Sequence, residues 1–384
     1  MRRLWRALIG LGDVLVLGAF ALGLAARHVR PGALTWPLQL LGPLVPALAA
    51  LVVAVALVRV WRAGAGTRLA YGLAAAAVVV RFGLPFGGGA DVRAGDLTVV
   101  TYNVPRWAGP DTSRKADEID AYVRRVRPAI LAFQEPTLYY RASAPERVVV
   151  APFLRRLRDS LGYRVGRTAF SPTSRSRLPV FTRGLRIVQA DESRMRADSS
   201  GAFTDIARVA FALAAAPRPA GDAAAVPESL PDTSAARTAV LYNVHLYTHG
   251  ARKPWDDPGF SLRHPRSWAV YLARFRDAHL RRAWEADSLR ALLDAETRPV
   301  LVVGDFNATA HEWPFARIRS ARGGLTDALG KAGRGWNATY HRDLPLLRID
   351  HVLVSREWQI VAARVPRDVA ASDHLPVEVR LRMR

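Results

Sequence analysis

The chain has 384 residues, half of them hydrophobic, no cysteine, and a formal net charge of +22 from 55 Lys and Arg against 33 Asp and Glu. The lack of cysteine excludes disulfides, thiolate metal sites and a cysteine nucleophile. Nearly all of the positive charge is arginine, since lysine occurs only at Lys115, Lys253 and Lys331. A GC-rich genome would produce this bias, and so would attraction to anionic lipid headgroups or phosphorylated substrates, so charge alone does not identify a nucleic-acid binder.

The first part of the chain is apolar from residue 7 to residue 86. A stretch of about twenty apolar residues has the length that spans the core of a bilayer. We therefore predict a membrane module in residues 1–90 with about three transmembrane helices, at 7–26, 40–58 and 69–86. A signal peptide is the alternative for the first helix, but its apolar part would be shorter and further apolar segments would not follow it.

Arginines before the first predicted span and after the second give a weak prediction of topology. They are Arg2, Arg3, Arg6, Arg59, Arg62 and Arg68. Because positive loops favour the cytoplasmic side, three spans place the rest of the chain outside the cytoplasm, whereas two would leave it inside. Arg81 interrupts the third span, and we predict three. The prediction is then a multi-pass protein of the cell membrane with an extracytoplasmic domain. Membrane lipids are among its predicted partners.

Residues 95–384 are predicted to form one large α/β domain. In chain order we expect a strand at 97–103, helices at 112–127 and 149–161 on either side of a strand at 129–133, a strand pair at 178–188, a strand at 239–245, a helix at 267–295, and strands at 300–304, 349–355 and 377–381. Residues 215–236 are rich in Ala, Pro, Asp and Ser, which predicts a disordered insertion or surface loop. Apolar strands that alternate with helices favour a layered α/β sandwich.

Polar side chains follow or end these strands. They are Asn103, Glu135, Asn243, His245, Asp305, Asn307, Asp350, Asp373 and His374. Each has an ordinary explanation when taken alone, such as an Asx turn at 304–307 or a structural role for a single histidine. Together they supply the oxygen ligands that a hard divalent cation prefers and the imidazoles that handle protons and phosphate charge.

The motifs that contain these residues also resemble those of a known family. They are Thr101-Tyr-Asn, Phe133-Gln-Glu-Pro, Asn243-Val-His-Leu, Gly304-Asp-Phe-Asn-Ala, Ile349-Asp-His-Val and Ser372-Asp-His-Leu-Pro-Val. In identity, order and rough spacing they resemble the endonuclease/exonuclease/phosphatase superfamily over about residues 96–383. The resemblance implies a four-layered, DNase I-like α/β sandwich and Mg²⁺- or Mn²⁺-dependent cleavage of phosphate esters.

The resemblance also implies roles for individual residues. Glu135 matches the glutamate that binds the metal, Asn103 the asparagine that supports the metal site, and Asp373 is a further candidate ligand. One-metal and two-metal mechanisms both remain open.

The catalytic roles are implied in the same way. Asp305 would align or deprotonate the attacking water or bind a metal, and Asn307 would hold phosphoryl oxygens. His245 would stabilise charge on the phosphate. His374 matches a phosphate-binding or proton-carrying histidine, and Asp350 the aspartate that orients it. His351 is expected to pack or to face solvent.

Two features depart from the family pattern. A mid-domain motif resembling Ile-Leu-Ser-Arg is matched only loosely by Val180-Phe-Thr-Arg, which ends at Arg183. The tyrosine that some nucleases use near the phosphate cannot be placed, with Tyr163 and Tyr247 as candidates, and the DNA-binding loops of the nucleases are not recognisable.

The fusion of such a domain to about three spans resembles bacterial membrane proteins linked to glycopeptide-antibiotic resistance. The prediction is a membrane-anchored metal-dependent phosphoesterase that acts on a lipid-linked or envelope phosphate. The alternatives are an anchored nuclease, a sphingomyelinase-like phosphodiesterase, and a non-catalytic binding module on the same fold. Trp255, Trp268, Trp284 and Trp313 are candidates for membrane-facing or substrate-rim positions, although core packing is expected for most of them.

Overall fold

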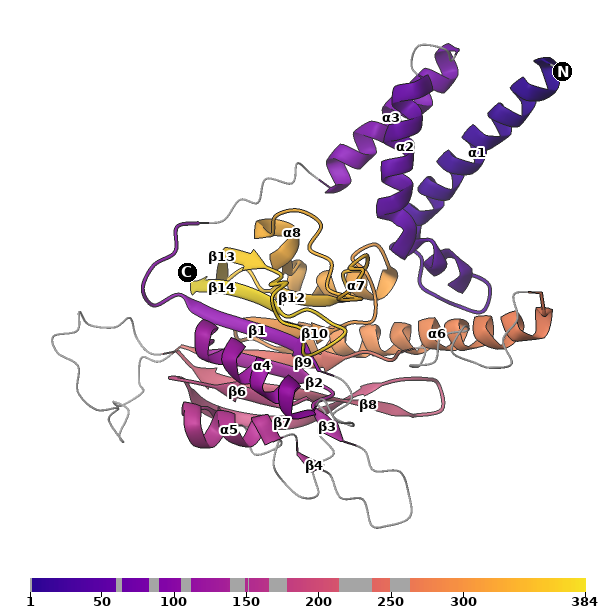
Figure 1. Cartoon of the computed structure of the whole chain (residues 1–384). Coiled ribbons are helices and arrows are strands. Elements are labelled where there is room, and N and C mark those ends of the chain that lie inside the picture. Colours follow the sequence, from indigo (N-terminus) through magenta and orange to yellow (C-terminus); the bar gives the residue numbers. More distant parts are fainter. Residues whose placement is uncertain are drawn as a thin grey trace.

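The computed structural model describes residues 2–59, 64–82, 90–104, 112–138, 149–150, 152–165, 178–213, 237–248 and 263–384. The predicted insertion at 215–236, the end of the third predicted span, and the side chains of Arg62 and Trp255 lie outside this part of the chain. Figure 1 shows a group of N-terminal helices beside a layered α/β domain.

The N-terminal part consists of three helices, α1 (Arg2–Ala26), α2 (Val45–Arg59) and α3 (Ala65–Phe82), with two short 3₁₀ helices, η1 (Trp36–Leu40) and η2 (Gly42–Leu44), between the first two. Two described segments, Leu8–Ala26 and Trp36–Val58, are long and apolar enough to cross a membrane. Large apolar side chains on them point outward, for example Leu15 at 62% and Leu57 at 70% exposure. A water-exposed surface of this kind is costly, whereas a bilayer would cover it. α3 is not one of the two segments, so the third span stays a prediction.

The acidic residue of the first predicted span has a partner. The Tyr71 hydroxyl of α3 donates a hydrogen bond of 2.9 Å to Oδ1 of Asp13 in α1. Polar groups at membrane depth are stable when they pair inside a helix bundle. This contact and the apolar cluster around Phe20, Val45 and Val52 hold the three helices together.

The first sheet of the α/β domain has six strands. Their order is β13 (Trp358–Arg364), β14 (Val377–Met383), β1 (Leu97–Asn103), β2 (Ile130–Gln134), β6 (Val180–Thr182) and β5 (Arg164–Val165). β1 and β2 are parallel, with Asn103 opposite Gln134 at their carboxyl ends. The chain therefore brings Asn103 and the residue that follows Gln134 to one edge of this sheet.

The second sheet also has six strands. Their order is β11 (Thr326–Asp327), β12 (Asp350–Val354), β10 (Val300–Asp305), β9 (Thr238–His245), β8 (Phe203–Ala212) and β7 (Arg186–Arg196). A separate pair is formed by β3 (Thr137–Leu138) and β4 (Val149–Val150). In the second sheet β10 is parallel to β9 and antiparallel to β12.

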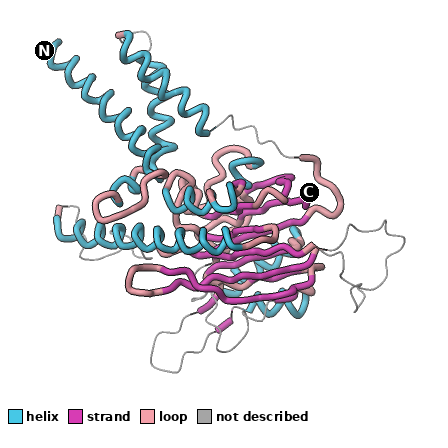
Figure 2. Tube along the Cα trace, turned by 180° about the vertical axis from the view of Figure 1, so that it is seen from behind, coloured by secondary structure: helices cyan, strands magenta, loops and turns pink. Residues whose placement is uncertain are grey.

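The domain has four layers, as predicted. Apolar side chains of both sheets, such as Val99, Leu301 and Val379, form the core between them. The helices α4 (Thr112–Val126) and α5 (Pro152–Leu161) cover the outer face of the first sheet. α6 (Pro265–Ala295) and α7 (Trp313–Arg319) cover the outer face of the second sheet, while the short helix α8 (Ala328–Ala332) joins the central core. Figure 2 shows the stacked strands from behind, with α6 running along them.

Two predictions of local structure were wrong. The predicted helix at 149–161 begins only at Pro152, because Val149–Val150 pair with β3 as a strand. The predicted strand pair at 178–188 is not a pair, since β6 belongs to the first sheet and β7 to the second. Both errors have one physical cause, which is that strand pairing is decided by distant segments and not by local pattern.

Gly304, near the end of β10, cannot carry a side chain. Its φ is +135°, and a Cβ would collide with the carbonyl oxygen of Val244 in the neighbouring strand. We expect Gly304→Ala to lower the free energy of unfolding by about 3 kcal/mol or more. Gly184→Ala is the control, because φ is also positive there (+71°) with open space around the Cβ, and it should cost only about 1 kcal/mol. Denaturant unfolding of both variants measures this, and equal losses would contradict the packing argument.

The segment between the N-terminal helices α1 and α2 is bound to the α/β domain. The Gln39 side chain is fully buried, donates to the carbonyl oxygens of Ala26 and Val29, and accepts a hydrogen bond of 3.0 Å from the backbone N–H of Trp313 in α7. Gly42 lies against Glu312, where a Cβ would come within 2.5 Å of Cγ.

The cationic side chain of Arg30 also holds this segment against the α/β domain. Nε of Arg30 donates to Asp287 of α6 at 2.9 Å, and its guanidinium lies 5.0 Å from the ring centroid of Trp284 and 5.8 Å from that of Trp313. Trp284 and Trp313 are therefore interface residues. We call the contacts of Arg30, Gln39 and Gly42 with the α/β domain the juxtamembrane contact.

Candidate active site

Asp305 lies at the centre of the predicted residues because of strand register. It ends β10, and its neighbours across the sheet are His245 at the end of β9 and Asp350 at the start of β12. Each of the three residues lies at one end of a buried, apolar strand, and these three strand ends meet at the same edge of the sheet. Register therefore brings together three side chains that are separated by 60 and 45 residues in the sequence.

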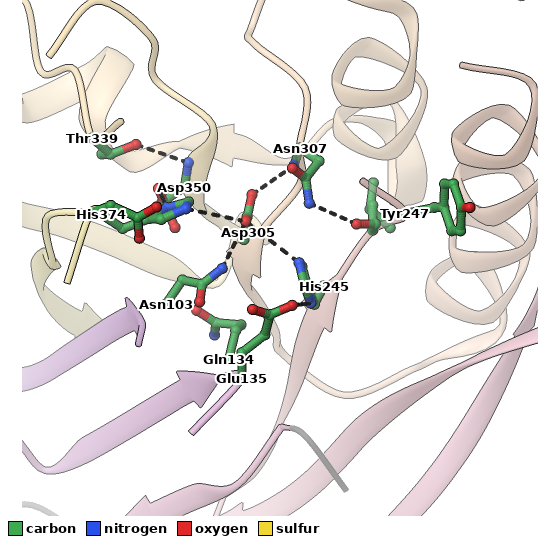
Figure 3. Close-up of polar contacts among 12 residues, drawn as sticks. Asn103, Gln134, Glu135, His245, Tyr247, Asp305, Asn307, Thr339, Asp350 and His374 are labelled. Atoms are coloured by element: carbon green, nitrogen blue, oxygen red, sulfur yellow. Dashed lines mark hydrogen bonds and ion pairs between the residues drawn. The ribbon is translucent and has the colours of Figure 1, made fainter. Parts of the chain in front are cut away.

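Hydrogen bonds and ion pairs fix the Asp305 carboxylate, which is 1% exposed. Nδ2 of Asn103 donates to Oδ2 at 2.9 Å from the first sheet, and the backbone N–H of Asn307 donates to Oδ1 at 2.8 Å. Nε2 of His245 lies 3.6 Å from Oδ2. Figure 3 shows these side chains converging on Asp305 from both sheets.

His374 and Asp350 form a buried pair. Nδ1 of His374 lies 2.9 Å from Oδ2 of Asp350, and Nε2 faces Asp305 at 3.9 Å. The Ser372 hydroxyl accepts a hydrogen bond from the backbone N–H of His374 and donates one of 2.7 Å to the carbonyl oxygen of Asn103. The loop that carries His374 is thus tied to the end of β1.

The burial of this cluster changes its proton affinities. Burial and then the charge of Asp350 raise the pKa of Asp305, although His374 and His245 oppose the rise. Burial alone would lower the pKa of His374, but the carboxylates of Asp350, Asp305 and Asp373 raise it to about 10. His374 is therefore a cation at neutral pH, and Asp305 is a stronger base than an ordinary aspartate.

The raised pKa of His374 predicts a pH dependence of stability. The pKa in the folded chain is about 10, above the ordinary value of about 6.5. The folded state then binds more protons than the unfolded state, so the stabilisation is fully present below pH about 6.5 and is lost as pH rises through about 10. Unfolding of the metal-free chain between pH 6 and 10 should show this fall. His374→Asn should remove that part of it, and the same fall in both proteins would contradict the assignment.

The three residues predicted to bind metal lie at different positions around Asp305. Asn103 touches it directly. Glu135 follows β2 with φ +55°, and its Oε1 lies 3.6 Å from Nδ1 of His245. Asp373 is half-buried, with Oδ1 at 3.4 Å from the Ser372 hydroxyl. Among the described residues, ligand atoms of Asp305, Asp350 and His374 lie within 4.8 Å of one another. The ligand roles of Asn103, Glu135 and Asp373 stay predictions.

The oxygen atoms of this centre fit a hard divalent cation. Oδ1 of Asn103 and Oδ1 of Asp350 are buried and have no hydrogen-bond partner. Leaving such atoms unpaired is costly, so a ligand that coordinates oxygen is a physical reason for them. Carboxylates and an amide oxygen are the donor set that Mg²⁺ and Mn²⁺ prefer.

The structure also defines the contacts of Asn307, His351 and Tyr163. Asn307 has φ +45°, and its Nδ2 donates to the carbonyl oxygen of Leu246 at 2.8 Å. His351 packs in the core, which is one of the two alternatives expected for it. It is buried between Phe306 and Phe315, and burial lowers its pKa to about 4. Tyr163 donates to the carbonyl oxygen of Pro128, at the far end of β2, so it was a wrong candidate for a tyrosine at the phosphate.

Arg183 is also distant from the centre, since its backbone N–H donates to Ala129 just before β2. Tyr247 lies close to the centre. Its backbone N–H donates to Glu285 at 2.8 Å, and its exposed fraction is 38%.

A buried charge network between α6 and the residue that precedes α7 was not predicted. Arg282, 3% exposed, donates from Nη1 to the carbonyl oxygen of Asn307 and lies 2.9 Å from Nδ1 of His279. Glu312 accepts a hydrogen bond of 2.6 Å from the backbone N–H of Thr309 and contributes charge to the surroundings of Arg282. In the sequence these are ordinary helix charges, and only their burial distinguishes them.

Gln134 was also missed as a structural residue, although it stands inside a quoted motif. Its Nε2 donates to Oδ1 of Asn243 at 2.6 Å and to the hydroxyl of Thr101 at 3.0 Å. Nδ2 of Asn243 donates back to the carbonyl oxygen of Phe133. These bonds join the two sheets directly beneath the centre.

Three solved structures illustrate the proteins to which the fold of this chain is similar. An endonuclease/exonuclease/phosphatase from Bacteroides vulgatus is 16% identical, with a TM-score of 0.46, over 75% of this chain and 99% of that one. A mannosyl-6-phosphatase from Bacteroides thetaiotaomicron is 16% identical, with a TM-score of 0.46, over 75% and 100%. Humanized D. rerio TDP2 is 11% identical, with a TM-score of 0.47, over 76% and 100%. No curated protein matches the chain significantly in sequence.

The family itself is identified by sequence. Residues 100–374 match the model of the Endonuclease/Exonuclease/phosphatase family, and this range holds every residue of the centre described above. Members of this family are hydrolases that act on phosphate esters. The chain belongs to the Endonuclease/Exonuclease/phosphatase family.

Proposed function

We propose that this protein is a membrane-anchored, divalent-metal-dependent phosphoesterase whose substrate is a lipid-linked or envelope phosphate. The observation that carries the proposal is the buried Asp305 carboxylate, which has His245, Asp350 and His374 around it. A base, an oriented cationic imidazole and unpaired oxygen atoms in one site are the groups needed for phosphoryl transfer to water.

The residues of the centre have separate tasks in this reaction. Asp305, held by Asn103 and the N–H of Asn307, orients the attacking water and takes its proton. His374, held by Asp350 through Nδ1, presents Nε2 to a phosphoryl oxygen or to the leaving oxygen. His245 adds positive charge next to the phosphate when it is protonated. The Nδ2 group of Asn307 donates to a backbone carbonyl, so its role on phosphate would require it to turn.

Asn103, Glu135, Asp350 and Asp305 supply the oxygen atoms that would hold Mg²⁺ or Mn²⁺. When bound, the cation polarises the phosphoryl group and offsets its negative charge. The protein's own contribution is to keep these oxygens fixed before the substrate arrives, which is why the surrounding hydrogen bonds matter for rate.

The membrane part of the proposal is supported by the two apolar segments and by the juxtamembrane contact. An enzyme fixed beside a bilayer meets lipid headgroups at a high effective concentration. The excess of arginine, within a net charge of +22, favours anionic lipids. We place the α/β domain outside the cytoplasm, following the arginine distribution and the predicted third span.

The test uses the full chain in lipid nanodiscs with Mg²⁺ or Mn²⁺. The substrates are a polyprenyl phosphate, a polyprenyl pyrophosphate, common phospholipids and DNA. Metal-dependent turnover of a lipid phosphate is expected. Cutting of DNA with strong salt dependence and no lipid turnover would instead indicate an anchored nuclease, and binding without turnover of any substrate would indicate a non-catalytic module.

A further inference from the structure

The helix α6 is longer than the sheet that it covers. It runs antiparallel to β10, and Arg282 reaches the carbonyl oxygen of Asn307 just past the end of that strand. Residues before Arg282 therefore extend beyond the carboxyl end of the strands, where the active site lies. Figures 1 and 2 both show this N-terminal part of α6 projecting from the sheet on the side of the membrane helices.

The projecting part carries an aromatic and apolar stripe. Its members are Trp268, Tyr271, Leu272, Phe275 and His279. With about 100° per residue, these positions and Arg282 fall within an arc of about 100°. On the covered part of the helix the same arc holds Leu289 and Leu293, which pack on the second sheet. The stripe is thus the core-facing side of α6, continued past the core.

The rings of the stripe form a continuous row. Ring centroids lie 6.5 Å apart for Trp268 and Tyr271, 4.7 Å for Tyr271 and Phe275, and 6.1 Å for Phe275 and His279. Trp268 is 37% and Leu272 39% exposed. The row ends at His279, which contacts Arg282, the residue that touches the Asn307 loop. It spans roughly 20 Å from Trp268 to Arg282.

We propose that this stripe binds the hydrocarbon chain of a lipid phosphate whose phosphate group lies in the Asp305 centre. His279 and Arg282 are buried, so the part of the row open to an occupant runs from Trp268 to Phe275. An occupant on that part has one end beside the Asn307 loop of the centre and an apolar body along α6, which is the shape of a phosphate ester with a long chain. α6 also carries Asp287 and Trp284, which hold Arg30 beside the membrane segments. The apolar row and the proposed bilayer therefore meet on one helix. This inference rests on the proposed function.

The opposite side of the projecting helix provides a matched control. Val270 is 56% exposed, is apolar like Leu272, and lies two residues away, hence about 200° around the helix. Arg274 and Arg281 lie on the side of Val270. A change at Val270 therefore alters the same helix and the same kind of residue without altering the stripe.

The absence of cysteine from the sequence gives a direct binding test. Leu272→Cys and Val270→Cys are each labelled with an environment-sensitive fluorophore, in the full chain in zwitterionic nanodiscs with chelator. Dioleoyl phosphatidic acid should give a saturable blue shift at position 272 and none at position 270, and dioleoylglycerol should give none. No shift at 272, an equal shift at 270, or an equal response to dioleoylglycerol would each overturn the inference.

Measurements of turnover distinguish a failure of this inference from a failure of the proposed function. With Mg²⁺, Leu272→Asp should lower the ratio of kcat/KM for dioleoyl to dihexanoyl phosphatidic acid by about tenfold, and Val270→Asp should leave that ratio unchanged. If the wild type binds the dioleoyl lipid at position 272 but hydrolyses neither ester, the binding surface stands and the hydrolytic function on this class fails. If it hydrolyses both esters with no shift at position 272 and no change of ratio, the function stands and the binding surface is wrong.

Discussion

Asp305→Ala is expected to lower kcat/KM for phosphate ester hydrolysis by about 10⁴-fold. The carboxylate is the meeting point of Asn103, the N–H of Asn307, His245 and His374. Its loss removes the proposed base and a metal oxygen together. Steady-state kinetics on one substrate measures the effect.

The control for this variant is Asp368→Ala, since the Asp368 side chain is 61% exposed and pairs with Arg125 on the surface. It should change kcat/KM by less than about twofold. Asp305→Ala also removes a carboxylate whose pKa is raised by burial and then by the charge of Asp350, so the variant should stay folded. A folded Asp305→Ala protein with wild-type turnover would exclude this centre as the active site.

A fragment that starts at residue 95 is expected to be less stable than the full chain by about 5 kcal/mol. It lacks the juxtamembrane contact, so Trp284 and Trp313 lose the guanidinium of Arg30 and the buried N–H of Trp313 loses its acceptor, Gln39. Glu312, which holds the backbone at Thr309, also loses the cover of Gly42. The unfolding free energy of the α/β domain, compared with and without residues 1–94, tests this.

Gln39→Ala in the full chain separates the effect of the contact from the effect of the N-terminal helices. It should cost about 1–3 kcal/mol, because it leaves the buried N–H of Trp313 without its acceptor and removes one donor from each of the carbonyl oxygens of Ala26 and Val29. Gln189→Ala is the matched control, since Gln189 is exposed on β7. If the fragment and the full chain unfold with equal free energy, the N-terminal part is a tether and not a component of the folded domain.

The sequence was most informative where a buried strand ends in a polar residue. Asp305, His245 and Asp350 were correctly predicted to lie at strand ends, because each ends or begins an apolar run. Strand register then brings the three side chains together. The pairing of strands was harder to predict from the sequence. β7 is a polar strand of eleven residues without the apolar alternation that indicates a strand, so its hairpin with β8 and its place in the second sheet depend on tertiary context.

The supporting network could not be read from the sequence for a related reason. Arg282 and Glu312 are thirty residues apart and differ from surface charges only in being buried. Their partners are backbone groups of the Asn307 loop, which carry no signal in a sequence. The juxtamembrane contact was missed in the same way, because Gln39 lies one residue before the predicted span at 40–58, and nothing in the sequence around it indicates that it is buried against the α/β domain.

The most direct test of the central account measures metal binding and hydrolysis on the same protein. The full chain in nanodiscs is stripped with chelator and titrated with Mg²⁺ or Mn²⁺ by calorimetry, and release of 4-nitrophenol from mono- and diester 4-nitrophenyl phosphates is followed at each step. We predict that hydrolysis appears in proportion to bound cation in the wild type, and that Asp305→Asn loses both hydrolysis and most of the affinity. Hydrolysis that is equal before and after stripping, or that persists in folded Asp305→Asn, would contradict the account.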